Sequence, residues 1–314
     1  MFEITLNPIG RFDAYRLTDQ STGEYLEVLA DVGVGLNDLM VKNGSGELVS
    51  MIAGYSSDQE IRNTMHSGFK GSKLSPFPNR LYHGKYEFEG SVFQMFINEV
   101  EGNNNLHGLL HNKPFELVSK KSDDKSAELV LSHEYLGTEV GYPFSYKILV
   151  SYKMTSGNLK IKTTLENTDT INLPLGDGWH PYFKYDNVDN VNLRMENAAR
   201  VSSLAGNSLS QRHGFENKNL INESKLDDCF EIEDRNKFNV FLEDQTSKTK
   251  IGIWQDSGVG QYRYLQVYTP DDRKSIAIEP VTCPPNAFNT RKDLIVLAPK
   301  GKTDFSIGIS FNAL

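Results

Sequence analysis

Four short segments of the chain carry side chains suited to moving protons and binding a polyhydroxylated molecule. They are Asn79-Arg80, His107-Gly108, His180-Pro181-Tyr182-Phe183 and Glu279-Pro280. Together they supply a guanidinium group, two imidazoles and a carboxylate, and imidazole and carboxylate groups are common acids and bases in proton-transfer catalysis. If the fold brings the segments together, the set holds a base, an acid and a cation, which is what proton transfer at a sugar hemiacetal requires.

His180 has the most distinctive context of the four. Gly176 and Gly178 precede it, Pro181 follows it, and three aromatic residues lie within the same stretch. This pattern favours an imidazole in a shaped pocket, with ring faces available for sugar C–H groups. An aromatic core with a hydrogen-bonded histidine fits the same composition, so the stretch alone leaves both readings open.

Glu279 ends an apolar run that begins at Ser275, and Pro280, Pro284 and Pro285 follow it. The pattern predicts a buried strand, and the prolines are expected to end its hydrogen-bonded pairing with neighbouring strands. A carboxylate at the mouth of such a strand loses solvation, which raises its pKa and makes it a better base. Most glutamates at strand ends are simply exposed, which is the alternative reading.

Arg80 and His107 are weaker candidates taken alone. Two prolines in Ser75-Pro76-Phe77-Pro78 stiffen the approach to Arg80, which would hold its fork of donors at a fixed angle. His107 lies in a polar, turn-prone stretch, with His111 four residues away as a second imidazole. A solvated arginine and a solvated loop histidine are the alternatives.

The segments, their order and their surroundings resemble the aldose 1-epimerase (galactose mutarotase) family over most of the chain. His180-Pro181-Tyr182-Phe183 matches the family's motif around its second catalytic histidine, and the run from Glu279 to Asn289 resembles its catalytic-glutamate segment. His107-Gly108 is similar to its His-Gly motif, although Leu109 replaces a frequent second glycine. The resemblance implies that Glu279 is the base, His180 the acid, and His107 a group that steadies charge.

The resemblance also assigns residues to sugar hydroxyls. Asp227 is preferred to Asp228 because it lies three residues before Phe230, as in the family's Asp-x-x-Phe segment, and a one-residue slip would exchange the two. Gln266-Val267-Tyr268-Thr269 resembles the family's Gln-x-Tyr-Thr strand. The full set of expected substrate-binding residues is Asn79, Arg80, Asp227 and Gln266.

The fold class that the pattern predicts is all-β. Period-two alternation is clear at residues 144–153, 159–163 and 305–311, and the stretch 86–97 reads as a hairpin with Gly90-Ser91 at its turn. The best helical candidate is the short stretch 58–65. Many short antiparallel strands fit a barrel, a sandwich or a propeller, although no fixed repeat supports a propeller. The resemblance implies a large antiparallel β-sandwich of the galactose mutarotase-like supersandwich type, and we expect residues 1–314 to form one domain.

Composition excludes several partners. The 314 residues carry a net charge of −8 without a basic cluster, so nucleic acid and anionic membranes are not expected. The N-terminus lacks an apolar signal segment, and no apolar run is long enough to span a bilayer, which predicts a soluble cytoplasmic protein. Cys229 and Cys283 are expected to be free thiols, since no Cys/His cluster suggests zinc. We expect neither a cofactor nor a metal, and the sequence does not indicate an oligomeric state.

The activity that the resemblance implies is interconversion of the α and β anomers of a free aldohexose such as glucose or galactose. A hexose-6-phosphate 1-epimerase remains the alternative, with Lys70, Lys73 and Arg212 as cations for the phosphate. A non-catalytic carbohydrate-binding β-sandwich would not need the acid and base. A glycoside hydrolase would need opposed carboxylates, for which Asp177, Asp227 and Glu279 are the candidates.

Overall fold

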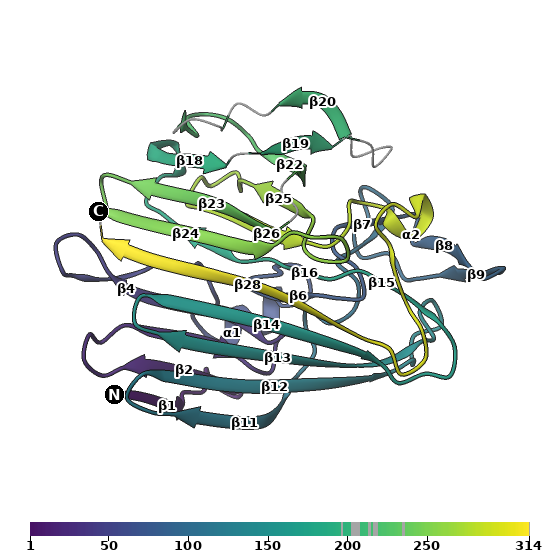
Figure 1. Cartoon of the computed structure of the whole chain (residues 1–314), viewed down its shortest axis with the longest axis horizontal. Helices are drawn as coiled ribbons and strands as arrows, with labels where there is room; N and C mark the ends of the chain where they lie inside the picture. Colours follow the sequence, from purple (N-terminus) through teal and green to yellow (C-terminus); the bar gives the residue numbers. More distant parts are fainter. Residues whose placement is uncertain (196, 202–207, 213–214, 216–218, 234–235, 314) are drawn as a thin grey trace.

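A nine-stranded antiparallel sheet forms one layer of the protein (Figure 1). The computed structural model describes residues 1–195, 197–201, 208–212, 215, 219–233 and 236–313. In spatial order the strands of this sheet are β11 (Glu116–Ser122), β12 (Ser126–Leu136), β13 (Ser145–Thr155), β14 (Asn158–Asn167), β28 (Lys302–Ala313), β24 (Thr249–Asp256), β23 (Lys237–Asp244), β18 (Val191–Met195) and β21 (Asn219–Leu220).

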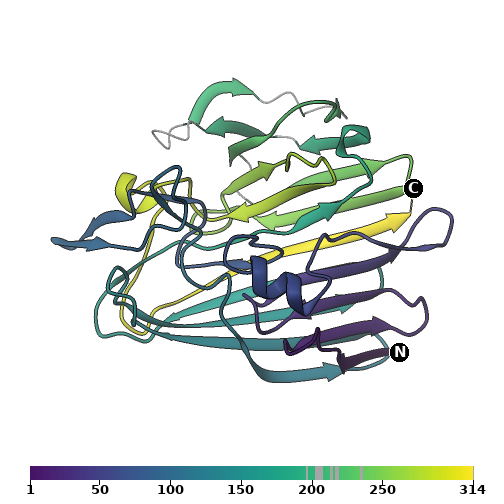
Figure 2. The same cartoon turned by 180° about the vertical axis from the view of Figure 1, so that it is seen from behind.

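Two further sheets lie behind this layer in Figure 1, and Figure 2 shows them from their own side. The five-stranded sheet contains, in order, β1 (Phe2–Leu6), β2 (Ala14–Asp19), β3 (Tyr25–Leu29), β4 (Gly35–Lys42) and β5 (Leu48–Ser50). The eight-stranded sheet has the order β20 (Ser208–Arg212), β19 (Ala198–Val201), β22 (Asp227–Ile232), β25 (Tyr264–Tyr268), β26 (Ser275–Val281), β16 (Gly178–Trp179) and β6 (Lys73–Leu74), with β17 (Tyr182–Lys184) also paired to β26.

Short pairs of strands and short helices complete the described structure. The pairs are β7 (Arg80–Tyr82) with β10 (Asn104–Leu106), β8 (Lys85–Phe88) with β9 (Ser91–Gln94), and β15 (Leu173–Leu175) with β27 (Ile295–Leu297). The helices are α1 (Asp58–Thr64), α2 (Ala287–Thr290) and the 3₁₀-helix η1 (Val188–Asn190). Among the described residues, no helix has the length and apolar character needed to cross a membrane.

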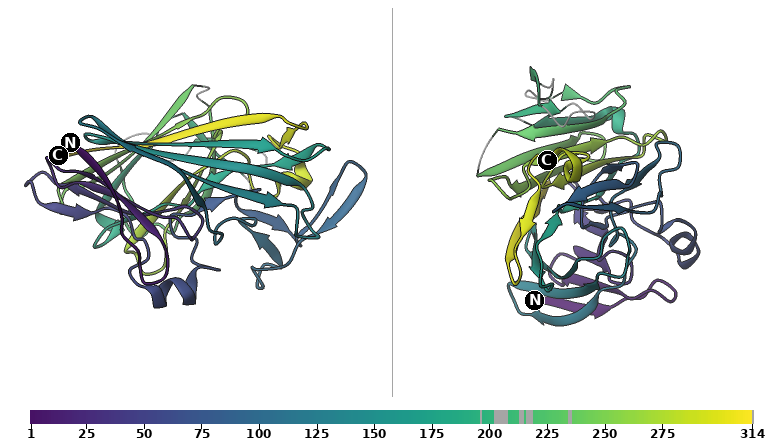
Figure 3. Two further views of the ribbon diagram at one scale, coloured as in Figure 1. Left: turned by 90° about the horizontal axis from the view of Figure 1, so that it is seen from below. Right: turned by 90° about the vertical axis from the view of Figure 1, so that its right-hand side faces the viewer.

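The hydrophobic core lies between the layers, which Figure 3 separates in its left-hand view. Alternate residues of β13 are buried, so this strand turns one face inward, as its period-two pattern predicts. Tyr152 of β13 packs against Trp179 of β16, with ring centroids 5.9 Å apart, and thereby joins the nine-stranded and eight-stranded sheets. One cluster of buried apolar side chains extends from Phe2 to Phe311. The predicted all-β antiparallel sandwich is confirmed.

Local details follow and correct the sequence pattern. The predicted helix at 58–65 is α1, which begins after Ser57, whose Oγ accepts a hydrogen bond of 3.2 Å from the backbone N–H of Glu60. The hairpin predicted at 86–97 is present, and its turn lies one residue earlier than the predicted Gly90-Ser91. Its turn residues are Glu89 and Gly90, with φ angles of 47° and 80°, because a two-residue turn of this kind needs positive φ at both central positions.

Candidate active site

Glu279 lies on β26, in the middle of the eight-stranded sheet. On one side β26 pairs with β25, and Glu279 stands opposite Gln266. On the other side the neighbouring strand is split into β16 and β17, which pair with Val281 and with Ala277 and its neighbours. The strand continues through Pro280 to Val281, so this proline does not end the ladder as expected. Glu279 therefore faces the break between β16 and β17 rather than the strand's exposed end, and it is only 2% exposed.

His180 lies in that break. Its backbone N–H donates to the carbonyl of Ser72 at 3.1 Å, and its own carbonyl accepts from the N–H of Gly71 at 3.0 Å. Gly71 has a φ of 65°, and a Cβ atom there would lie 2.1 Å from the carbonyl oxygen of Leu36, so glycine is required at this close approach. These contacts fix the backbone of His180, and its Nε2 lies 3.4 Å from Oε1 of Glu279.

His107 is held by a reciprocal contact with Asn79. Its backbone N–H donates to the carbonyl of Asn79 at 2.9 Å, while the backbone N–H of Asn79 donates to His107 Nδ1 at 3.0 Å. Both residues have positive φ, 63° for His107 and 59° for Asn79, a conformation that is uncommon away from glycine. Because Nδ1 accepts a hydrogen bond, the proton of the neutral imidazole is on Nε2. His107 is therefore set as a hydrogen-bond donor.

The three candidate catalytic side chains meet in one buried cluster. One ligand atom from each of His107, His180 and Glu279 can be chosen so that all lie within 4.8 Å of one another. The two imidazole rings are 5.1 Å apart in an edge-to-face arrangement, and Phe69 packs beside both. The same atoms are a donor set that a divalent metal such as zinc accepts. Proton transfer between them needs no metal.

Burial sets the charge of the cluster. It lowers the pKa of His180 to about 3. It also lowers the pKa of His107 well below its ordinary value, and the positive charge of a protonated His180 would act in the same direction. Burial raises the pKa of Glu279 well above its ordinary value, with Asp227 adding to the rise and Arg80 opposing it. The uncharged form of each group is thus favoured, which suits a site that exchanges protons with a neutral ligand.

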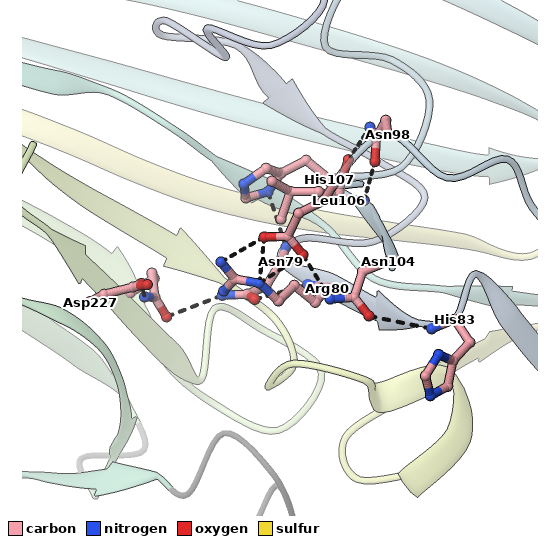
Figure 4. A network of polar contacts seen from close by, with 10 residues as sticks. Asn79, Arg80, His83, Asn98, Asn104, Leu106, His107 and Asp227 are labelled. Atoms are coloured by element: carbon pink, nitrogen blue, oxygen red, sulfur yellow. Dashed lines mark hydrogen bonds and ion pairs between the residues drawn. The ribbon is translucent and has the colours of Figure 1, made fainter. Parts of the chain in front are cut away.

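A chain of polar contacts extends from this cluster (Figure 4). The side-chain amide of Asn79 donates to Oε1 of Gln266 at 3.2 Å, and Gln266 Nε2 donates to Oδ1 of Asp227 at 2.7 Å. Asp228 points elsewhere and pairs with Arg200 at 2.7 Å. The structure therefore brings together Asn79, Gln266 and Asp227, and it separates Asp228 from them.

Arg80 reaches the same region but has a partner that the sequence did not suggest. Its Nε lies 2.9 and 3.1 Å from the two carboxylate oxygens of Glu99, and its Nη2 lies 2.9 Å from Oε1. The Arg80 side chain remains 34% exposed. No motif contains Glu99, and no sequence signal marks it as the partner of a residue on another strand.

The alternative imidazole, His111, lies outside the cluster. It packs edge-to-face against Phe69, with ring centroids 4.7 Å apart. Sequence reasoning also overlooked Phe69. The available signal was the pair of glycines in Gly68-Phe69-Lys70-Gly71, which favours an unusual backbone, and in the structure Phe69 has a φ of 49°. Tyr182, already part of the histidine motif, stacks on His180 with ring centroids 4.6 Å apart.

The cations considered for a phosphate are engaged by the protein itself. Lys70 pairs with Glu60 and also donates to the carbonyl of Gly54. Lys73, expected at the surface, is completely buried against Asp177. The side chain of Arg212 lies outside the described residues.

The carboxylates considered for a glycoside hydrolase include Asp177. Since Asp177 is fully buried and paired with Lys73, it is not placed as a second carboxylate opposite Glu279.

His111 makes the stability of the fold sensitive to acid. Its side chain is buried, and burial is the main cause of a pKa lowered to about 4. As the pH falls from about 6.5 to about 4, the His111 imidazole takes up a proton in the unfolded chain but not in the folded chain, so the free energy of unfolding falls.

Between pH 7.5 and pH 4.5, we expect His111→Phe to remove about 2 to 3 kcal/mol of the decrease in the free energy of unfolding, measured by urea unfolding. The matched control is His83→Phe at an exposed histidine. Equal pH dependence in His111→Phe and the parent protein would contradict this assignment.

Comparisons with known proteins identify the family and the fold of this chain. The model of the aldose 1-epimerase family matches residues 15–310. The structure is similar to a galactose mutarotase-like protein from Clostridium acetobutylicum, with a TM-score of 0.85 and 19% identity, covering 100% of this chain and 99% of that one. It is also similar to galactose 1-epimerase from Lactobacillus acidophilus, with a TM-score of 0.77 and 17% identity, covering 100% and 98% of the two chains. The fold is therefore that of the galactose mutarotase-like proteins.

Sequence similarity points the same way. The uncharacterized protein YihR of Escherichia coli is 25% identical over 289 residues, which is 88% of this chain and 87% of that protein. Because the family model spans almost the whole sequence, the chain belongs to the aldose 1-epimerase family. The resemblance inferred from the four motif segments is confirmed.

Proposed function

We propose that the protein is an aldose 1-epimerase, an isomerase that interconverts the α and β anomers of a free aldohexose such as glucose or galactose. The observation that carries the proposal is the contact between His180 Nε2 and Glu279 Oε1, 3.4 Å apart in a buried cluster that also contains His107. An acid and a base side by side are what ring opening at C1 requires. Membership of the aldose 1-epimerase family supports the reaction class.

The reaction needs one proton on the pair formed by Glu279 and His180. Burial favours that proton on the carboxyl group of Glu279. Its transfer to the imidazole of His180 gives a carboxylate and an imidazolium. The carboxylate then removes the proton of the anomeric hydroxyl, while the imidazolium donates its proton to the ring oxygen. The C1–O5 bond breaks as the C1=O1 bond forms, and the sugar opens to an aldehyde.

Rotation about C1–C2 then presents the other face of the aldehyde to the same hydroxyl. Glu279 returns its proton to O1 and His180 recovers its proton from O5, so the ring closes as the opposite anomer and the enzyme is unchanged. His107, with its Nε2–H donor, steadies negative charge on the ring or carbonyl oxygen. No redox change and no second substrate enter the balance.

The remaining polar side chains select the hydroxyl pattern. Asn79, Gln266 and Asp227 form a continuous hydrogen-bonded row, and Arg80 adds donors beside it. A free sugar is favoured over a 6-phosphate because Lys70 and Lys73, the described cations considered for a phosphate, are already paired with carboxylates.

The proposed function is tested by proton NMR, which measures the rate of anomer interconversion for a panel of free aldoses and their 6-phosphates. Acceleration for no sugar by the folded protein would overturn it.

Gln266 provides a test of the hydroxyl-binding row. Gln266→Met removes the bonds to Asp227 and Asn79 while keeping much of the side-chain volume. We expect KM to rise about tenfold and kcat to change less than about threefold, because the lost interactions are made equally in the ground state and the transition state. Steady-state kinetics of anomer exchange provide the measurement. An unchanged KM would mean that Gln266 does not organise substrate binding.

A further inference from the structure

Glu99 lies beside the hydroxyl-binding row, although it belongs to none of the four motif segments. Its carboxylate contacts Arg80 at two points, through Nε at 2.9 and 3.1 Å and through Nη2 at 2.9 Å. A carboxylate that engages two nitrogens of a guanidinium fixes the plane and direction of that group. The Glu99 side chain is 20% exposed, so it is more protected from solvent than a typical surface ion pair.

The position of Glu99 is set independently of Arg80. The backbones of Glu99 and Asn104 exchange hydrogen bonds of 3.1 Å in both directions. The side-chain amide of Asn104 also donates to Oε2 of Glu99 at 2.7 Å. Two residues further along β10, Leu106 stands opposite Arg80 of β7. The carboxylate is therefore anchored by its own turn, and it can act on the orientation of Arg80.

The pairing changes what Arg80 can offer a ligand. A guanidinium has five N–H groups, and Glu99 engages one on Nε and one on Nη2, which leaves three for other partners. Its positive charge is balanced by Glu99, and Asp227, at the far end of the hydrogen-bonded row from Asn79, adds a negative charge. The influence of both Asp227 and Arg80 on Glu279 places these charges near the reacting groups. The region thus presents hydrogen-bond donors without a net positive charge.

We propose that Glu99 is a positioning and specificity-determining residue, which directs Arg80 toward substrate hydroxyls and cancels its charge so that the site selects an uncharged aldose over an anionic one. Hydroxyl groups need directed donors but no counter-charge, whereas a carboxylate or phosphate needs an uncompensated cation. The inference rests on the proposed function, because it names the substrate class of that same site.

The test compares two substrates in one assay. Anomer exchange of glucose and of glucuronate, which differ by a carboxylate at C6, is measured for the parent protein and for Glu99→Gln. We expect kcat/KM for glucuronate relative to glucose to rise about five- to tenfold in Glu99→Gln, because one nearby negative charge is lost. Glu99→Asp keeps the charge on a shorter side chain, so kcat/KM should fall for both sugars with the ratio unchanged. Glu166→Gln, which removes the partner of Lys302 at the surface, changes the total charge equally and should leave the ratio unchanged.

Several results would overturn the inference. A ratio that stays within about twofold in Glu99→Gln, or that rises equally in Glu166→Gln, would show that Glu99 does not set specificity through Arg80. If the parent protein accelerates neither sugar, the proposed function fails for this pair, and the ratio of the two Kd values measured by calorimetry tests Glu99 on its own. The same shift in the Kd ratio would support its role in specificity, and an unchanged ratio or the absence of binding would overturn it.

Discussion

Glu279→Gln is expected to lower kcat/KM for anomer exchange by about two to four decades while the protein stays folded. Glutamine has nearly the shape of the carboxyl group but cannot accept and return the anomeric proton. Because Glu279 is only 2% exposed and burial raises its pKa, which favours the neutral carboxyl group, a neutral amide in its place should not reduce the free energy of unfolding at neutral pH. Proton NMR exchange rates and thermal unfolding of the same samples measure both parts.

A matched control separates this effect from a general change of charge. Glu166 lies on β14 and pairs with Lys302 at the surface, so Glu166→Gln should leave exchange unchanged. His180→Asn removes the proposed acid while keeping a polar side chain, and it should reduce exchange to a similar extent. Normal turnover in folded Glu279→Gln would rule out the mechanism.

Lys73→Met is expected to lower the free energy of unfolding by about 3 to 5 kcal/mol. Lys73 and Asp177 are both fully buried and form an ion pair, and Tyr262 donates a hydrogen bond of 2.7 Å to the same carboxylate oxygen. Removing the ammonium leaves a buried carboxylate with its desolvation cost uncompensated. Urea unfolding at pH 7 gives the difference.

Two further variants sharpen this prediction. Lys162→Met removes an exposed partner of Asp304 and should cost less than about 1 kcal/mol. Lys73→Met combined with Asp177→Leu removes both charges and should recover most of the lost stability, since apolar replacements of a whole buried pair are often neutral. A loss below about 1 kcal/mol in Lys73→Met alone would contradict the expected cost.

The buried pair also connects the stability of the fold to the geometry of the site. Asp177 precedes His180 by three residues, and Thr282 follows Glu279 by three. The backbone N–H of Asp177 donates to Thr282 Oγ1 at 2.9 Å, and the N–H of Thr282 donates to the carbonyl of Asp177 at 2.9 Å. These bonds hold the segments that carry the proposed acid and base in register.

The elements of the fold were predictable where local pattern decides the structure. The alternation in β13 and the short helix α1 both follow from their sequences, since burial of one face and a serine N-cap are local properties. The hairpin turn at Glu89-Gly90 was misplaced by one residue because a non-glycine residue also adopts positive φ there. Residue type alone gave no sign of that conformation.

The residues of the candidate site were predictable from the motifs, but their long-range partners were not. The motif segments identified His107, His180 and Glu279, which the structure brings together. The partners of charged residues were not accessible in the same way. Lys73 reads as a surface cation because Asp177, its counter-charge, lies 104 residues away. Such pairings depend on which strands become neighbours, which the local pattern does not specify.

The most direct test of the central claim is anomeric exchange followed by proton NMR in ¹⁸O-labelled water with the parent protein and a free aldohexose. Ring opening breaks C1–O5 and leaves the anomeric oxygen bonded to C1. We therefore predict faster interconversion of the α and β anomers, seen in their anomeric proton signals, without faster entry of ¹⁸O at C1. Label entering C1 at the rate of inversion would mean that the C1–O1 bond breaks, and unaccelerated exchange with folded protein would mean that this sugar is not a substrate. The first result would contradict the proposed ring opening by Glu279 and His180, and the second, if found for every free aldohexose, would contradict the proposed activity.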